Sequence, residues 1–221
     1  MKKDNSRILF WLVAVAVVAV GIYLVSKAGM TPPEVDTTPS EKVVAQITAE
    51  DWTKGTGELE IIEYSDFQCP ACSAYSAIIK EVAGEFGNHV TIAYRHFPLN
   101  MHPNATPAAQ SSEAAGIQGK FWEMSDYMFE HQGGWSQLDG LALEEVFTGY
   151  AEALELDTEK FIADYNSKGV KDAVAADYKS GQEANVQYTP YFIFNGERVE
   201  NPRSLEGFRS LIRENLENET T

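Results

Sequence analysis

Cys69 and Cys72 are the residues of this sequence best suited to chemistry. They are the only two cysteines among its 221 residues, and only Pro70 and Ala71 separate them. Proline is favoured at the first position of a helix, where a backbone N–H has no intrahelical partner in any case. Cys69 would then be the N-cap residue, where unpaired N–H groups and the helix dipole favour a thiolate. The spacing predicts a redox dithiol in which Cys69 attacks and Cys72 is its sheltered partner.

Two other uses of the cysteine pair fit the sequence less well. A structural zinc site needs about four ligands, and no two histidines of the chain lie close enough in sequence to complete one with the cysteines: His89, His96, His102 and His131. A structural disulfide that closes so short a loop would stabilise the fold by only about 2 kcal/mol in the chain-entropy treatment. We therefore predict no metal and no other cofactor.

The segments around the dithiol predict a strand, a helix and a second strand. Leu59–Tyr64 and Val90–Tyr94 are rich in β-branched and aromatic residues, as strands are. Apolar residues recur at helical spacing between Ser73 and Phe86. A unit of this kind implies a right-handed crossover between parallel strands. Val43–Ile47 predicts an earlier strand, and Gly55–Gly57 a turn after it.

The region from Asn100 to Gln187 has no convincing strand pattern. Five stretches in it predict helices: 107–117, 120–132, 141–154, 158–165 and 170–184. Strand signals resume at Tyr191–Phe194 and continue through an Asn-Gly hairpin turn to Glu200. An amphipathic helix follows Ser204. The pattern predicts an α/β domain with an inserted helical subdomain at about residues 100–187.

The N-terminal region predicts a membrane anchor. Residues 1–7 are basic, and the uncharged run 8–26 is long enough to cross a bilayer as one transmembrane helix. The positive-inside rule keeps the amino terminus in the cytoplasm and the rest of the chain outside it. We expect a signal-anchor at 1–28, a Thr/Pro-rich linker at 29–42 and a folded domain at 43–221. A cleaved signal peptide is the alternative, and either arrangement places the cysteines in an oxidising compartment.

The charge balance excludes some partners. The formal net charge is −16, which disfavours binding to nucleic acid or to an anionic lipid surface, because both call for positive patches. No dimerisation segment is evident, so we expect a monomer.

With these features in place, the chain resembles the DsbA-like thioredoxin-fold family of exported thiol-disulfide oxidoreductases. The resemblance covers about residues 43–216 and rests on three stretches that occur in the same order: Tyr64–Cys72, Gly119–Met124 and Tyr188–Gly196. It implies a thioredoxin fold with an inserted helical subdomain, preceded here by the N-terminal transmembrane helix.

The resemblance also implies roles for individual residues. Cys69 matches the nucleophile of the family, Cys72 its resolving cysteine, and Pro190 the cis-proline that faces the dithiol. A cis bond at this point would turn the backbone of Thr189 toward the site, where an extended substrate segment can pair with it. An ordinary trans proline at the start of a strand is the alternative.

Glu63 matches the acidic residue that family members keep beneath the dithiol. The resemblance implies that it exchanges a proton with Cys72, since a buried carboxylate is costly unless it has such a task or a partner. A solvent-facing position on the strand is the alternative. Asp66 is also close in sequence, and a negative charge there would oppose ionisation of Cys69.

Two positions depart from the best-known member of the family. Ala71 stands where that oxidase has histidine, and Thr189 where it has valine. We expect Pro70, Ala71 and Thr189 to contact substrates, so these differences bear on the direction of exchange.

The sequence therefore predicts an enzyme: a single-pass protein of the cell membrane with an extracytoplasmic thiol-disulfide oxidoreductase domain. Its expected substrates are reduced exported polypeptides, to which it donates a disulfide, and a membrane partner would reoxidise it. A disulfide reductase or isomerase of the same fold is one alternative. A tethered peptide-binding or chaperone-like module is the other.

Overall fold

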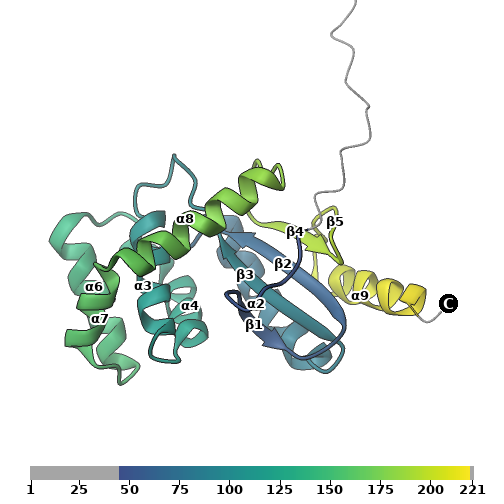
Figure 1. Ribbon diagram of the computed structural model, residues 1–221, viewed down its shortest axis with the longest axis horizontal. Helices are drawn as coiled ribbons and strands as arrows, with labels where there is room; N and C mark the ends of the chain where they lie inside the picture. The colour runs from purple at the N-terminus through teal and green to yellow at the C-terminus, as the bar shows by residue number, and fades with distance from the viewer. Residues whose placement is uncertain (1–44, 220–221) are drawn as a thin grey trace, which may run out of the picture. The chain divides into compact units, whose positions relative to one another are not determined.

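A mixed β-sheet organises the part of the chain that the computed structural model describes, residues 45–219 (Figure 1). The strands of this part are β1 (Trp52–Gly55), β2 (Leu59–Ser65), β3 (Val90–His96), β4 (Tyr191–Phe194) and β5 (Glu197–Arg198). Its helices are α2 (Pro70–Phe86), α3 (Ala105–Gly116), α4 (Phe121–Glu130), α5 (Gln132–Trp135), α6 (Gly140–Ala153), α7 (Thr158–Tyr165), α8 (Lys168–Glu183) and α9 (Leu205–Glu219).

The strand order is β1-β3-β2-β4-β5. Strands β2 and β3 are parallel, and α2 is the crossover between them, as the sequence predicts. Strand β4 runs antiparallel to β2, and β5 antiparallel to β4. In this register Glu63 of β2 lies beside Tyr94 on one side and Phe192 on the other.

Alternation along the strands separates the two faces of the sheet. One face packs apolar residues of β2, β3 and β4 against α2 and α9, including Ile61, Ile92, Phe192 and Phe208. The opposite face packs on the C-terminal part of α8 and the segment after it. Glu63 lies two residues after Ile61 on the same strand, so its side chain lies on the same face, which α2 covers.

Six helices, α3 to α8, lie between β3 and β4 in the chain, where the sequence predicts five. Their core surrounds the fully buried Trp135, whose indole N–H donates to the Met128 carbonyl oxygen at 2.9 Å. The same hydrophobic cluster includes Phe67 and Cys72, so the helical core continues to the dithiol. The short helix α5 was not expected from the sequence.

The first strand differs from the prediction. Residues 45–47 are irregular, and β1 begins instead at Trp52, where it pairs antiparallel with β3. The Trp52 indole stacks on Phe121 with ring centroids 5.0 Å apart and donates to the Glu113 carboxylate at 2.8 Å. The four residues of β1, Trp-Thr-Lys-Gly, carry no apolar pattern that predicts a strand, so its contacts with distant residues decide its position.

The predicted anchor and linker, residues 1–42, lie outside the described residues, as do Val43 and Val44. No helix within residues 45–219 is long and apolar enough to span a bilayer.

Candidate active site

The first turn of α2 presents the two cysteines. Cys69 is the N-cap residue with extended backbone angles, and Pro70 begins the helix, as predicted. Both cysteines are free thiols. Cys69 is 6% exposed and Cys72 is fully buried, so only Cys69 has any access to a partner outside the protein.

The environment separates the acidities of the two thiols. The pKa of Cys69 is lowered to about 5, first by a hydrogen bond with the Cys72 thiol. The Thr189 side chain and the backbone N–H groups of Cys72 and Ala71 lower the pKa further, whereas burial opposes the shift. Burial raises the pKa of Cys72 well above its ordinary value, and the neighbouring Cys69 adds to this effect. At neutral pH the negative charge therefore resides on Cys69.

A proline loop faces the dithiol. The Thr189–Pro190 peptide bond is cis, as expected. The Cys69 sulfur lies 3.5 Å from the Thr189 carbonyl oxygen, and Asn201 donates its side-chain N–H to the Pro190 carbonyl oxygen at 2.7 Å. The Thr189 carbonyl oxygen, next to the cis bond, is thus the part of this loop in contact with the more accessible sulfur.

Glu63 lies beneath the dithiol and is 4% exposed. Burial raises its pKa to about 7, while the Ser65 hydroxyl and the Lys54 ammonium act in the opposite direction. The carboxyl group can therefore gain or lose a proton near neutral pH. The alternative of a solvent-facing Glu63 is wrong, because the strand turns this position toward α2.

The expectation that the Asp66 charge opposes ionisation of Cys69 rested on closeness in sequence, and Asp66 is not among the groups that shift the pKa of Cys69. Its carboxylate accepts hydrogen bonds from the backbone N–H groups of Gln68 at 2.8 Å and Leu99 at 2.9 Å. It also lies 2.7 Å from His102 Nδ1. These contacts direct the carboxylate to the loop after β3. The Asp66 backbone approaches the dithiol instead: its N–H lies 3.5 Å from the Cys72 sulfur, and its carbonyl oxygen accepts from the Cys69 backbone N–H at 3.0 Å.

Pro70 and Ala71 are exposed beside Cys69. An open groove of about 600 Å³ borders Pro70 and is also lined by Gln68, Met101 and residues 136–139. The groove therefore reaches Pro70, one of the two residues between the cysteines.

Sequence reasoning missed the amides that hold this groove together. The Gln68 side chain accepts from the Asn104 backbone N–H at 2.6 Å and donates to the Ser136 carbonyl oxygen at 2.7 Å. Asn104 donates its side-chain N–H to the Leu138 carbonyl oxygen at 2.6 Å. Gln132 donates to the carbonyl oxygens of Phe67 at 2.7 Å and Cys69 at 3.0 Å. No spacing rule in the sequence connects these residues.

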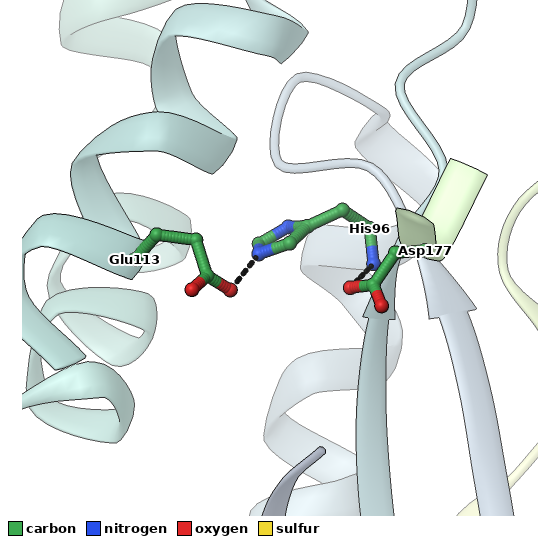
Figure 2. A group of neighbouring side chains, drawn as sticks. All are labelled: His96, Glu113 and Asp177. Atoms are coloured by element: carbon green, nitrogen blue, oxygen red, sulfur yellow. Dashed lines mark hydrogen bonds and ion pairs between the residues drawn. The ribbon is translucent and has the colours of Figure 1, made fainter. Parts of the chain in front are cut away.

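A second polar cluster joins the sheet to the helices (Figure 2). His96 of β3, Glu113 of α3 and Asp177 of α8 approach within 4.8 Å of one another, the one such group of potential metal-ligating side chains found within residues 45–219. His96 Nε2 lies 2.9 Å from the Glu113 carboxylate, and the His96 backbone N–H donates to Asp177 at 2.9 Å. The pKa of Asp177 is raised to about 6, chiefly by burial. These hydrogen bonds account for the arrangement, so we assign the cluster to packing.

Comparisons with known proteins bear on the fold that carries these residues. A family model described as Thioredoxin matches residues 56–214. The crystal structure of oxidised BdbD from Bacillus subtilis superposes with a TM-score of 0.66 and 19% identity, over 76% of this chain and 94% of that one. The crystal structure of alpha-DsbA1 from Wolbachia pipientis gives a TM-score of 0.68 and 19% identity, over 80% and 96% of the two chains. At this level of identity the likeness concerns the fold.

A different kind of relative matches by sequence. Na(+)/H(+) antiporter NhaA 1 of Mycolicibacterium vanbaalenii is 39% identical over 147 residues, which are 65% of this chain but 23% of the antiporter. The chain thus spans about a quarter of the length of the curated relatives that it matches. We do not extend the antiporter activity to it.

Proposed function

This chain belongs to the thioredoxin family, with a DsbA-like fold, and we propose that it is a thiol-disulfide oxidoreductase that introduces disulfides into exported proteins. The observation that carries the proposal is the state of Cys69, a thiol with a pKa of about 5 at a helix N-terminus, 3.5 Å from the carbonyl oxygen of Thr189. Stabilisation of the thiolate favours the reduced dithiol, which makes the corresponding disulfide a better oxidant.

The exchange has two steps. A substrate thiolate attacks the Cys69 sulfur of the oxidised protein, so that a substrate–Cys69 disulfide forms while the Cys69–Cys72 bond breaks. Cys72 leaves as a thiolate and takes a proton from Glu63. A second substrate thiolate then attacks the substrate sulfur of the mixed disulfide and releases Cys69 as a thiolate, which its low pKa favours. The substrate has lost two electrons and the dithiol has gained them.

Substrate contact is assigned to the surface around Cys69. Pro70 and Ala71 follow it in the chain and are exposed, and the carbonyl oxygen of Thr189, which precedes Pro190, lies 3.5 Å from its sulfur. An extended substrate segment would pair with the backbone at Thr189, as in edge-strand addition.

The proposed setting follows from the sequence. Residues 1–28 would anchor the protein in the cell membrane, residues 29–42 would tether it, and the domain from residue 43 would lie outside the cytoplasm. The reduced dithiol then needs an oxidant, and we propose a membrane protein for this role, because tethering raises the effective concentration of the domain near such a partner.

The reduction potential of the Cys69/Cys72 couple, measured together with the oxidation of a reduced two-cysteine peptide, tests the proposal. We expect a potential in the oxidising half of the range known for this superfamily, and stoichiometric peptide oxidation that Cys69→Ser abolishes. A potential close to that of thioredoxin, about −270 mV, with efficient insulin reduction would indicate a reductase or isomerase instead. No turnover by a protein whose Cys69 remains alkylatable would indicate a peptide-binding module.

A further inference from the structure

Four polar side chains meet on one face of the sheet beneath the dithiol. Glu63 and Ser65 are two positions apart on β2 and therefore point to the same face. The parallel register places Tyr94 of β3 beside Glu63. The first turn of α2 covers this face with Cys72, and all four residues are buried. We call these four residues the sub-dithiol cluster.

Two hydroxyl groups of the sub-dithiol cluster are unpaired. Ser65 Oγ and the Tyr94 hydroxyl oxygen are inaccessible to solvent, and neither has a hydrogen-bond partner of normal geometry among the described residues. Buried polar groups are usually paired, because an unpaired one loses its hydrogen bonds to water without replacement. Phenylalanine in place of Tyr94, or alanine in place of Ser65, would avoid the cost of burying an unpaired hydroxyl.

The Tyr94 ring is held firmly in place. It stacks on Phe67 with centroids 5.1 Å apart and meets Phe121 edge to face at 5.5 Å. These contacts fix the position of its hydroxyl in the cluster. These apolar contacts would persist in Tyr94→Phe, so packing alone does not explain the hydroxyl.

Thiol-disulfide exchange creates a negative charge to which these two hydroxyls can donate hydrogen bonds. Negative charge must pass between the Cys72 sulfur and the Glu63 carboxylate when the proton moves. The Ser65 hydroxyl lowers the pKa of both groups, and negative charge on either group raises the pKa of Tyr94. A donor that is unpaired while the cluster is neutral can donate to the anion as soon as it forms, and a hydrogen bond to a charged group is stronger than one between neutral groups.

We propose that the hydroxyl groups of Ser65 and Tyr94 form a hydrogen-bonding site for the negative charge that passes between Cys72 and Glu63. This inference rests on the proposed function. Both are positioning residues: they touch no substrate, and they lower the free energy at which Cys72 gives up its proton to Glu63.

The other charged groups around Glu63 are few in the described part of the chain. From β1, the Lys54 ammonium acts on Glu63; it lies 3.9 Å from Asp126 of α4 and 4.2 Å from the centre of the Trp122 ring. The neighbour on β4 is the apolar Phe192. Lys54 thus supplies the positive charge and the two hydroxyls the hydrogen-bond donors.

The attack of Cys72 on a mixed disulfide tests the inference. Full-length protein with glutathione attached to Cys69 is mixed at a series of pH values, and the release of glutathione is followed by stopped flow. In this step the Cys72 thiolate forms a bond to Cys69, glutathione leaves as a thiolate, and the proton of Cys72 passes to Glu63. We expect the parent rate to rise with pH through the ionisation of Cys72.

Tyr94→Phe and Ser65→Ala should each raise the pH midpoint of this profile by about one unit. A hydrogen bond to a charged group corresponds to about a tenfold effect, so the rate at pH 7 should fall about tenfold. The rates should converge with the parent at high pH, where the thiolate forms without help. Tyr165→Phe, which removes a hydroxyl from α7, is the matched control and should leave the profile unchanged.

Stability separates this role from a structural one. Because the two hydroxyls are unpaired in the reduced protein, Tyr94→Phe and Ser65→Ala should unfold at urea concentrations equal to or above that of the parent. Unchanged pH midpoints in both variants would overturn the inference while leaving the proposed function intact. A parent that releases no glutathione at any pH would instead refute the proposed function.

Discussion

Glu63→Gln should change how the stability of the reduced protein depends on pH between 7 and 5, because two groups of the site titrate there with opposite effects. The pKa of Glu63 is raised from 4.5 to about 7, chiefly by burial, so its stabilising contribution increases as the pH falls toward the unfolded value. The pKa of Cys69 is lowered from 9.0 to about 5, first by its hydrogen bond with Cys72. Its contribution is present above the unfolded value and is lost as the pH falls through 5.

The two contributions are similar in size. One pKa unit corresponds to about 1.4 kcal/mol, so lowering the pH from 7 to 5 adds about 2 kcal/mol of stability through Glu63. The same change removes about 1–2 kcal/mol through Cys69, after a reduction for solvent screening near the sulfur. In the parent, these opposite changes in the free energy of unfolding nearly cancel. Relative to the parent, Glu63→Gln should therefore lose about 2 kcal/mol between pH 7 and 5, and Cys69→Ser should gain about 1–2 kcal/mol.

Urea unfolding of the reduced chains at pH 5, 6 and 7 measures these differences. Groups elsewhere, such as Asp177, titrate in all variants, so their contributions to the free energy of unfolding cancel when each variant is compared with the parent. The double variant should follow the sum of the two single changes, apart from the coupling within the site. Parallel pH curves for the parent and Glu63→Gln would refute the reasoning, because they would show that this carboxyl group does not titrate between pH 5 and 7.

Three further predictions concern the thiols and the packing. Cys72→Ser should accumulate mixed disulfides at Cys69 in cells, because the resolving thiol is gone; non-reducing gels without adducts, while Cys69 remains alkylatable, would show that the roles are wrongly assigned. Ala71→His should lower the pKa of Cys69 further and make the couple more oxidising, since an imidazolium favours the thiolate; a pKa titrated by thiolate absorbance at or above that of the parent would contradict this. Gly181→Ala should destabilise the fold by about 1–3 kcal/mol, because its Cβ would lie 2.5 Å from an aromatic side chain. Chemical unfolding measures this change. Gly149→Ala is the control and should not destabilise the fold, because the space around Gly149 is open.

The elements around the dithiol were predictable because their signals are local. The β-branched and aromatic residues of β2 and β3, the proline after Cys69 and the helical spacing of α2 are each contained within a few residues of the chain. The Asn-Gly turn between β4 and β5 is equally local. The cis bond before Pro190 was predictable for a different reason, the resemblance of its flanking stretch to a known family.

The position of β1 and the orientation of Asp66 were not predictable in this way. Strand β1 has four residues and depends on pairing with β3 and on the stacking of Trp52 against a ring of α4. The Asp66 carboxylate is directed by the loop that contains Leu99 and His102. Such contacts join residues far apart in the chain, so no short-range pattern in the sequence reports them.

The sequence by itself determined the fold class and the position of the dithiol, because strand-forming residue types, helical periodicity and the proline at the helix start act over short distances. Only the tertiary structure decided that Glu63 is buried beside Tyr94 and that two unpaired hydroxyls surround it. The reason is that burial and hydrogen bonding set the pKa of a carboxyl group or thiol. Both depend on which strands become neighbours and which helix covers them, and that is fixed when the chain folds.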